Sequence, residues 1–283
     1  MLQDWKTWVV IYLISAIVFA QKFKKTNQKM KNASCLTILL EIFTALFAIL
    51  FIPLFDFKIS LNPTTYFTLL IVVIIYAFTD RLNIEARYGL DPSIFSMLKQ
   101  LSTVFLIILG IFFLKEEIVI KKLIGSIIII AANILLAFDK GKFEVNKYFM
   151  MSILSNFLFA IAMLINVNIS DEFNLAFYTI LTVFIPSILI KTFGRYTFHD
   201  LKEEFHLYSK KDFLISAFMW CLMLISSVRA YQLGSVTLVA PLLTLTAILN
   251  TIYEYFMNHN KNKFIQKIIA SIFIVIGVLM IKI

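Results

Sequence analysis

Several charged side chains lie inside long apolar segments of this sequence, at positions where a charge is costly. The acidic ones are Glu41, Asp80, Glu85 and Glu254, and the basic ones are Arg81, Arg87, Lys99 and Arg229. An isolated charge in hydrocarbon costs several kcal/mol, so such residues usually pair with one another or line a water-filled cavity. The matching numbers of acids and bases favour pairing.

Three of these charges are predicted to share one layer. Glu41 and Lys99 each lie about 8 residues into an apolar segment, which at about 1.5 Å per helical residue places both roughly 12 Å from the same membrane face. Asp80 lies on a segment that runs the other way and reaches a similar level. Arg81 and Glu85 are four residues apart, so they can pair along one helix face.

This layer predicts a binding site for a small polar solute. Lys99, with Gln100, would anchor an anionic or carboxylate group. Glu41 and Asp80 would balance that charge, bind a cationic group, or carry a proton that couples transport. Polar residues on neighbouring faces complete the predicted site: Asn83, Ser96, Thr103, Arg229 and Asn250.

Structural roles compete with these assignments. Lys99 could form a structural ion pair with Glu41 or Asp80 instead of lining a cavity. Ser, Thr and Asn in membrane helices often bond their own backbone or join helices. Arg87, Arg229 and Glu254 lie near helix ends, where long side chains can extend to the interface. Trp220 and Tyr76 fit a packing role, with closure over a substrate as the alternative.

Composition predicts the surroundings of these residues. The chain has 283 residues, of which 60% are hydrophobic and only 15% charged, and its mean hydropathy is +0.89. Soluble domains are nearer half apolar and one quarter charged. The net charge of +9 lies in short loops, which is typical of membrane orientation signals rather than of nucleic-acid binding. We therefore expect an all-α integral membrane protein.

Apolar runs of bilayer length predict about ten transmembrane helices. They cover residues 3–20, 33–53, 64–87, 91–113, 119–138, 146–167, 172–192, 212–232, 235–257 and 264–281. The segment at 194–211 alternates polar and aromatic residues and fits an amphipathic stretch in the headgroup region. The spans divide into two sets of five, at residues 1–140 and 141–283. Because five is odd, the second set enters the membrane from the opposite side, as inverted repeats do in secondary transporters.

Motifs in both halves carry a family resemblance. The first half has Ser93, Leu98, Leu101 and Val104, then Glu116 or Glu117, then Ile124-Gly125-Ser126-Ile127. The second has Ala230-Tyr231-Gln232-Leu233-Gly234-Ser235, Val239-Ala240-Pro241-Leu242 and Ile274-Val275-Ile276-Gly277-Val278-Leu279. These motifs resemble those of ten-helix, EamA-type members of the drug/metabolite transporter superfamily. The chain departs from the pattern at Asn258-His259-Asn260, where the family has an acidic residue, and at Ala270, which replaces a glycine.

The orientation stays open at this stage. Most of the 26 lysines and arginines fall in the turns after spans 1, 5, 7 and 9, which places these turns in the cytoplasm and both termini outside. The family resemblance implies the reverse, with both termini inside.

The sequence offers little for other chemistry. We find no nucleotide-binding, metalloprotease or nucleophile motif in a plausible context, and His199, His206 and His259 lack metal-ligand spacing. Cys35 and Cys221 lie inside apolar segments, so we expect both to be buried free thiols. We therefore expect no catalytic residues, no metal and no cofactor, and transport driven by gradients or exchange.

The predicted function is secondary transport of a small polar metabolite, amino-acid-like or carboxylate-bearing, by alternating access in the cell membrane. Its expected partners are that solute, protons and the lipid bilayer. An integral membrane enzyme or lipid-handling protein and a non-transporting assembly partner are the alternatives. Substrate identity, direction, coupling ion and oligomeric state do not follow from the sequence.

Overall fold

The chain folds into a bundle of helices. The computed structural model describes residues 4–113, 119–139, 142–143, 145–165, 169–234, 239, 242–259 and 263–282. The longer helices of the first half are α1 (Trp5–Asn27), α2 (Ala33–Ile49), α3 (Pro63–Gly89), α4 (Pro92–Leu98), α5 (Leu101–Phe113) and α6 (Ile120–Ala137). Those of the second half are α7 (Lys147–Ile165), α8 (Leu175–Phe193), α9 (Phe198–His206), α10 (Lys210–Leu233), α12 (Thr246–Phe256) and α13 (Phe264–Lys282). Shorter elements are η1 (Ile52–Leu54), η2 (Ile169–Glu172) and the paired strands β1 (Phe138–Asp139) and β2 (Lys142–Phe143).

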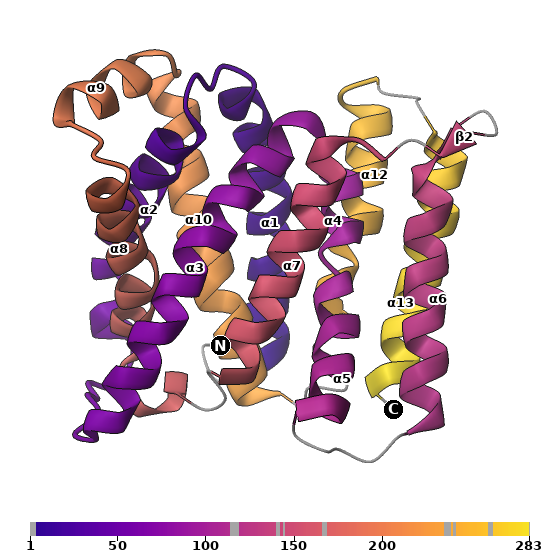
Figure 1. Ribbon diagram of the computed structural model, residues 1–283, viewed down its shortest axis with the longest axis horizontal. Helices are drawn as coiled ribbons and strands as arrows, with labels where there is room; N and C mark the ends of the chain where they lie inside the picture. Colours follow the sequence, from indigo (N-terminus) through magenta and orange to yellow (C-terminus); the bar gives the residue numbers. More distant parts are fainter. Residues whose placement is uncertain are drawn as a thin grey trace.

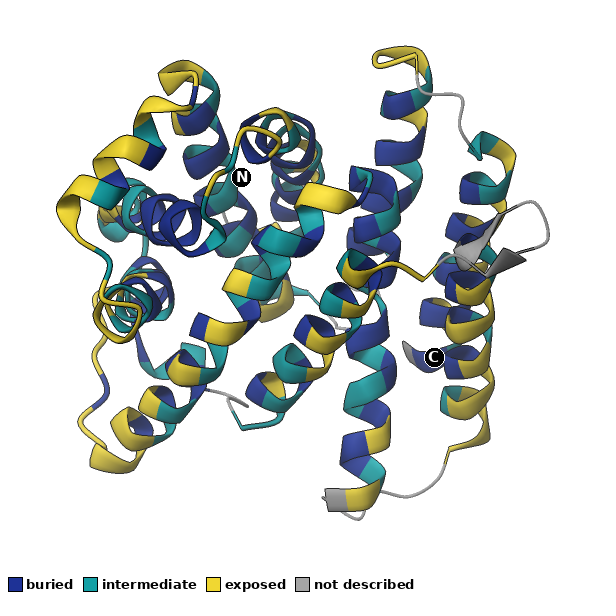
Figure 2. Cartoon of the chain, turned by 45° about the horizontal axis from the view of Figure 1, so that its top comes forward, coloured by how far each residue is buried: buried dark blue, intermediate teal, exposed yellow. Residues whose placement is uncertain are grey.

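Seven helical stretches in the described chain are long and apolar enough to cross a membrane. They are Trp5–Asn27, Pro63–Gly89, Pro92–Phe112, Lys147–Ile165, Leu175–Phe193, Lys210–Leu233 and Phe264–Ile281, and Ala33–Ile49 is a shorter apolar helix. Large apolar side chains such as Phe78, Phe112 and Ile127 are exposed on the outside of the bundle, and Figure 2 shows such exposed positions along the outward helix faces. A soluble protein rarely exposes apolar surface on this scale. The chain is an all-helical membrane protein.

Polar residues define where the helices begin. The side chains of Asn32, Asn62 and Asn174 each accept a hydrogen bond from a backbone N–H in the first turn of the helix that follows. Such caps satisfy donors that have no partner within the helix. Pro63 and Pro92 occupy the first helical positions of α3 and α4, where a missing N–H costs nothing.

The long helices stand side by side, and their ends lie at two opposite faces of the bundle (Figure 1). α1 packs along α10, α3 along α7, α2 along α8, and α6 along α13. The lysine-rich turn after α1, the segment with α9 and the C-terminal end of α12 lie at the upper end in Figure 1, whereas both chain ends lie toward the lower one. We call the upper end the cation-rich end.

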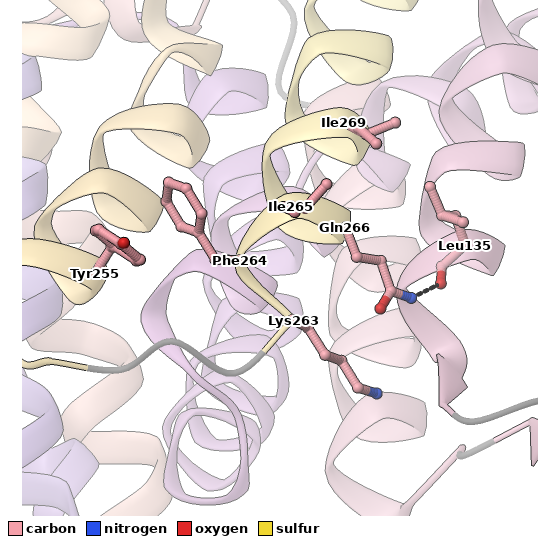
Figure 3. Close-up of a pocket in the computed structure, with 7 residues that line it drawn as sticks. All are labelled: Leu135, Tyr255, Lys263, Phe264, Ile265, Gln266 and Ile269. Atoms are coloured by element: carbon pink, nitrogen blue, oxygen red, sulfur yellow. Dashed lines mark hydrogen bonds between the residues drawn. The ribbon is translucent and has the colours of Figure 1, made fainter.

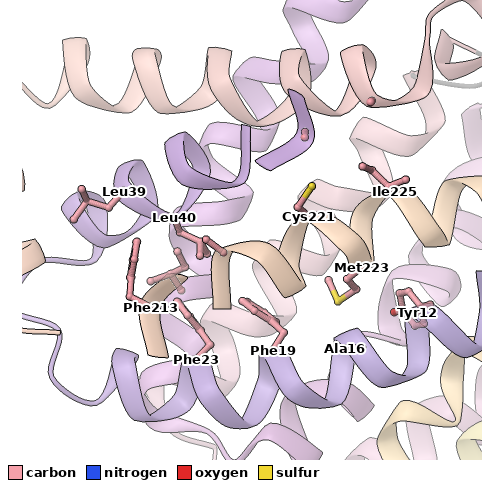
Figure 4. Packing of buried hydrophobic residues seen from close by; sticks show 14 of the residues in the cluster. Tyr12, Ala16, Phe19, Phe23, Leu39, Leu40, Phe213, Cys221, Met223 and Ile225 are labelled. Atoms are coloured by element: carbon pink, nitrogen blue, oxygen red, sulfur yellow. The ribbon is translucent and has the colours of Figure 1, made fainter. Parts of the chain in front are cut away.

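Two apolar clusters hold the bundle together. The first joins α1, α2 and α10 through side chains that include Phe19, Leu40 and Phe213 (Figure 4). The second joins α4, α5, α6 and α13, with Leu98 and Ile129 among its members. Side-chain hydrogen bonds link α1, in the first cluster, to α3, to the turn between α3 and α4, and to α12. The clusters therefore meet along a seam that carries polar contacts, described below.

The structure changes three details of the sequence-based expectation. The predicted single helix over 91–113 is broken at Lys99 and Gln100, between α4 and α5. Residues 21–27, expected as a loop, continue α1. The predicted amphipathic segment contains α9, which packs on the α1–α2 turn. The buried Glu204 carboxylate holds it there by accepting hydrogen bonds from the backbone N–H groups of Lys31 and Asn32, at 2.9 and 3.0 Å.

Glycines allow α6 and α13 to approach closely. A Cβ atom at Gly125 would lie 2.5 Å from the carbonyl oxygen of Gly277, and one at Gly277 would lie 2.8 Å from that of Gly125. Small residues at such crossings let helix backbones pack in contact within a membrane.

We predict that Gly125→Ala destabilises the protein, although alanine is the better helix former by up to about 1 kcal/mol. The added methyl group has no space, and overpacking of this kind costs about 1–3 kcal/mol. Thermal unfolding of the purified protein in detergent measures the effect. Ile127→Ala on the outward face of α6, where Ile127 is 64% exposed, is the control. An equal or higher melting temperature for Gly125→Ala would contradict the crossing.

Candidate functional site

A small cavity lies inside the bundle, where α1, α2, α3 and α10 meet. Its volume is about 10 Å³, enough for about one water molecule by this measure. It is lined by Phe19, Thr37, Leu40, Glu41, Asp80, Asn83, Ile84, Arg87 and Trp220. Three of the predicted site residues, Glu41, Asp80 and Asn83, are thus brought together from two helices.

Glu41 is the least satisfied polar group in this cavity. The residue is only 2% exposed, and no donor among the described residues reaches either of its carboxylate oxygens. Asp80 lies close enough to interact with it electrostatically. The two carboxyl groups lie within hydrogen-bonding reach of each other. Ionised carboxylates offer only acceptors, so this contact requires a proton on one of the two groups. Glu41 therefore holds unused hydrogen-bonding capacity in a buried position.

Asn83 connects the cavity to the second half of the chain. Its side-chain oxygen accepts a hydrogen bond of 2.8 Å from the hydroxyl of Ser155 on α7. This bond leaves the amide N–H groups of Asn83 beside Asp80, with which they also interact. The contact positions Asn83 as a donor on the Asp80 side of the cavity.

Arg87 also lines the cavity, although the sequence favoured a role at the membrane interface. Its guanidinium carbon lies 3.8 Å from the ring centre of Phe95, 5.0 Å from that of Phe19 and 6.0 Å from that of Trp220. The rings come from α1, α4 and α10, which are distant in sequence. The sequence position of Arg87, near the end of an apolar segment, does not predict these aromatic contacts. They become visible only when the fold brings the three rings together.

Lys99 lies at the break between α4 and α5, where it is half-buried. It is not among the residues that line the cavity, but Asp80 and Arg87 are near enough to interact with it electrostatically. The Ser102 hydroxyl donates to the Lys99 carbonyl at 2.7 Å, and Asn156 of α7 donates to the Leu98 carbonyl at 3.2 Å. These side chains satisfy backbone groups that the break exposes.

Ser96 and Asn250 belong to a second polar group, next to α1. The Asn250 amide donates to the Ser96 hydroxyl at 3.0 Å, and its oxygen accepts from the Gln21 amide at 3.0 Å. Asn258 donates in turn to Gln21 at 2.9 Å. This chain of hydrogen bonds ties α1 to α4 and α12.

The remaining predicted residues lie apart from the cavity. Gln100 donates only a long bond of 3.5 Å to the carbonyl of Ser96, within its own turn. Thr103 is half-buried on α5. Arg229 lies near the end of α10 that is opposite to the cation-rich end, where it donates to Gln232 at 3.1 Å. The structure therefore does not bring Arg229 to the other charged residues.

The structure contains a buried ion cluster around Lys267 that was not predicted from the sequence. Lys267 is 2% exposed, and its ammonium group lies 2.8 Å from Asp91 and 3.0 Å from Glu254. The Glu254 carboxylate also accepts the backbone N–H and hydroxyl of Ser93 at 2.8 and 2.6 Å. Glu254 is therefore paired inside the protein instead of reaching the interface. The expected Arg81–Glu85 pair is absent among the described ion pairs, and Arg81 donates to Ser34 at 2.8 Å instead.

A larger groove of about 630 Å³ lies between α6, α12 and α13 (Figure 3). Its lining is mainly apolar, with Tyr255, Phe264, Ile265 and Ile269, and it contains none of the predicted site residues. In a membrane protein, an apolar groove between helix flanks accommodates lipid. The polar cavity at Glu41 is therefore the better candidate for a site that binds a polar solute.

Comparison with known families gives one match. Residues 6–138 match the model of the EamA-like transporter family. This match, which covers almost half of the chain, supports EamA-type membership in the drug/metabolite transporter superfamily. This confirms the resemblance predicted from the motifs, and the matched EamA region includes Glu41, Asp80, Arg87 and Lys99. No curated protein matches the chain. The family match suggests a transporter.

We predict that Lys267→Met strongly destabilises the protein, because it leaves Glu254 buried without its counter-charge. Breaking one side of a buried pair costs about 3–5 kcal/mol. Lys22→Met is the control, since the Lys22–Asp212 pair is partly exposed and such pairs contribute at most about 1 kcal/mol. Unfolding in denaturant compares the two variants. The double variant Lys267→Met with Glu254→Gln should recover part of the loss. Similar free energies of unfolding for Lys267→Met and Lys22→Met would show that the buried ion cluster stabilises the protein no more than the partly exposed pair does.

Proposed function

We propose that this protein is a secondary transporter of a small polar metabolite, amino-acid-like or carboxylate-bearing, that works by alternating access. The observation that carries the proposal is the cavity with Glu41, Asp80 and Asn83 beside the Lys99 helix break, within a stretch that matches a transporter family. Charged residues at membrane depth mark solute or proton pathways in such proteins.

The proposed architecture is ten spans in two inverted repeats, residues 1–140 and 141–283. The helix pairings support it. If α1, α2, α3 and α6 correspond to α7, α8, α10 and α13, then the packing of α1 on α10 mirrors that of α7 on α3. The pairs α2–α8 and α6–α13 each join a helix to its own counterpart. Gly125 of α6 and Gly277 of α13 meet at this last crossing, where the two helix backbones pack closely.

The break at Lys99 also supports this architecture. Inverted-repeat transporters bind solutes near discontinuous helices at the interface of the two halves. α4 and α5 form such a helix, and their connection lies next to Asn156 of the second half.

The proposed roles follow from charge. Lys99, with Gln100, supplies positive charge that attracts an anionic group. Glu41 and Asp80 balance this charge, receive a cationic group, or exchange a proton during transport. Ser96, Asn250 and Thr103 contribute polar surface along the same seam. Because the sequence has no nucleotide-binding motif, an ion or solute gradient drives the cycle, and the proposed location is the cell membrane.

Transport in liposomes tests this function. A thermal-shift screen of the purified protein against amino acids, amines and phosphorylated metabolites identifies a solute, because a ligand of the native state raises its apparent stability. Uptake or exchange of that solute is then measured at two pH values.

We predict that Lys99→Ala and Glu41→Gln each reduce transport at least tenfold, because they remove charges at the site. Glu85→Gln, on α3 but outside the cavity, is the matched control and should transport normally. Unchanged flux in Lys99→Ala would refute its assigned role. Absence of flux for every solute, together with a stable stoichiometric partner, would favour the assembly function, and covalent turnover of a membrane substrate would favour an enzyme.

A further inference from the structure

The guanidinium group of Arg87 is held in place without using its hydrogen-bond donors. Three aromatic rings surround it, the nearest at 3.8 Å. Among the described residues it forms no ion pair within 4.0 Å and no side-chain hydrogen bond. Cation–π contacts hold a guanidinium in position but leave its N–H groups unsatisfied. The guanidinium N–H groups of Arg87 are therefore held in a fixed position and remain available to donate hydrogen bonds.

The N–H donors of Arg87 share a cavity with the carboxyl group of Glu41, which can accept hydrogen bonds. Glu41 lines the same cavity, and apart from the neighbouring Asp80 carboxyl group no described side chain or backbone group donates to its oxygens. Asp80 and Tyr12 are near enough to Arg87 to interact electrostatically, but neither forms an ion pair with it among the described contacts. One cation from α3 and one anion from α2 therefore face the same small volume without satisfying each other.

From this arrangement we propose that Arg87 binds the carboxylate of a zwitterionic substrate, and that Glu41 binds its ammonium group. A planar guanidinium matches a carboxylate with two parallel hydrogen bonds, which a lysine ammonium cannot reproduce. Lys99 then contributes charge from the helix break, whereas Arg87 makes the direct contact. The inference rests on the proposed transport site and narrows its substrate to molecules that carry both charges.

Two of the three rings around Arg87, those of Phe19 and Trp220, also line the cavity. The cavity holds only about 10 Å³, so an amino acid enters after the helices separate. Phe19 and Trp220 lie on α1 and α10, which pack tightly together, whereas Phe95 lies on α4. Arg87 therefore contacts both apolar clusters, at the seam where an opening motion would admit the substrate.

Binding to purified wild-type protein tests the proposal independently of transport. The 20 common amino acids are screened by thermal shift, and the tightest binder is compared with its decarboxylated amine and its deaminated acid by calorimetry. We expect an amino acid to bind at least tenfold more tightly than either analogue. Failure of every amino acid to bind, or equal affinity for an analogue, would overturn the zwitterion assignment. Flux of a simple carboxylate in liposomes would then still support the proposed transporter.

Two variants assign the contacts. Arg87→Lys keeps the charge but removes the fork, and should weaken amino-acid binding at least tenfold. Arg81→Lys, on the same helix but bonded to Ser34, is the control and should bind as wild type. Glu41→Gln should weaken binding of the amino acid while leaving that of the deaminated acid unchanged. This second variant decides the question if Arg87→Lys does not fold. Wild-type affinity in Arg87→Lys, or equal losses for both ligands in Glu41→Gln, would refute the assignment.

Discussion

A charge within a membrane protein must find a partner inside the protein, and this constraint organises the whole bundle. Lys267 satisfies it with Asp91 and Glu254, and Lys24 donates to the carbonyl oxygens of Arg87, Tyr88 and Leu90 at the end of α3. A cation at a helix C-terminus also interacts favourably with the helix dipole. These contacts fix the α3–α4 turn against α1, α12 and α13. The few groups that lack such partners, at Glu41 and Arg87, therefore stand out.

The sequence predicted the positions of the helices well, because apolar runs of bilayer length leave few alternatives. Each predicted span contains a helix in the described chain, although α1 extends beyond its span, the span at 91–113 holds two helices, and α12 covers only Thr246–Phe256 of the span at 235–257. The break at Lys99 was not predictable, since lysine and glutamine are good helix formers and the bonds that stabilise the break come partly from Asn156. Hydropathy reports how apolar a segment is, not whether one helix or two will cover it.

Depth along a helix predicted part of the candidate site and missed the rest. Glu41 and Asp80 lie near one level on antiparallel helices, and the structure places them at one cavity. Lys267 was missed because it follows a polar turn, and its partner Asp91 lies 176 residues away. Arg87 was treated as an interface residue because it lies near the end of its apolar segment. The sequence could not show its aromatic contacts, since Phe19 and Trp220 reach it from other helices. Sequence gives the height of a side chain in the membrane but not its direction around the helix axis.

The interruption at Lys99 has a mechanical consequence. α4 is anchored at its start, where Asp91 and Ser93 bind Lys267 and Glu254, whereas α5 packs against α7. A continuous helix would transmit any tilt of α7 directly to that anchor. Because a turn at Lys99 and Gln100 separates α4 from α5, a tilt of α7 would act mainly on α5, and Lys99 would lie at the point where the two helices could change their angle. Its ammonium group would then shift with each swing of α5, relative to carboxylates that belong to other helices.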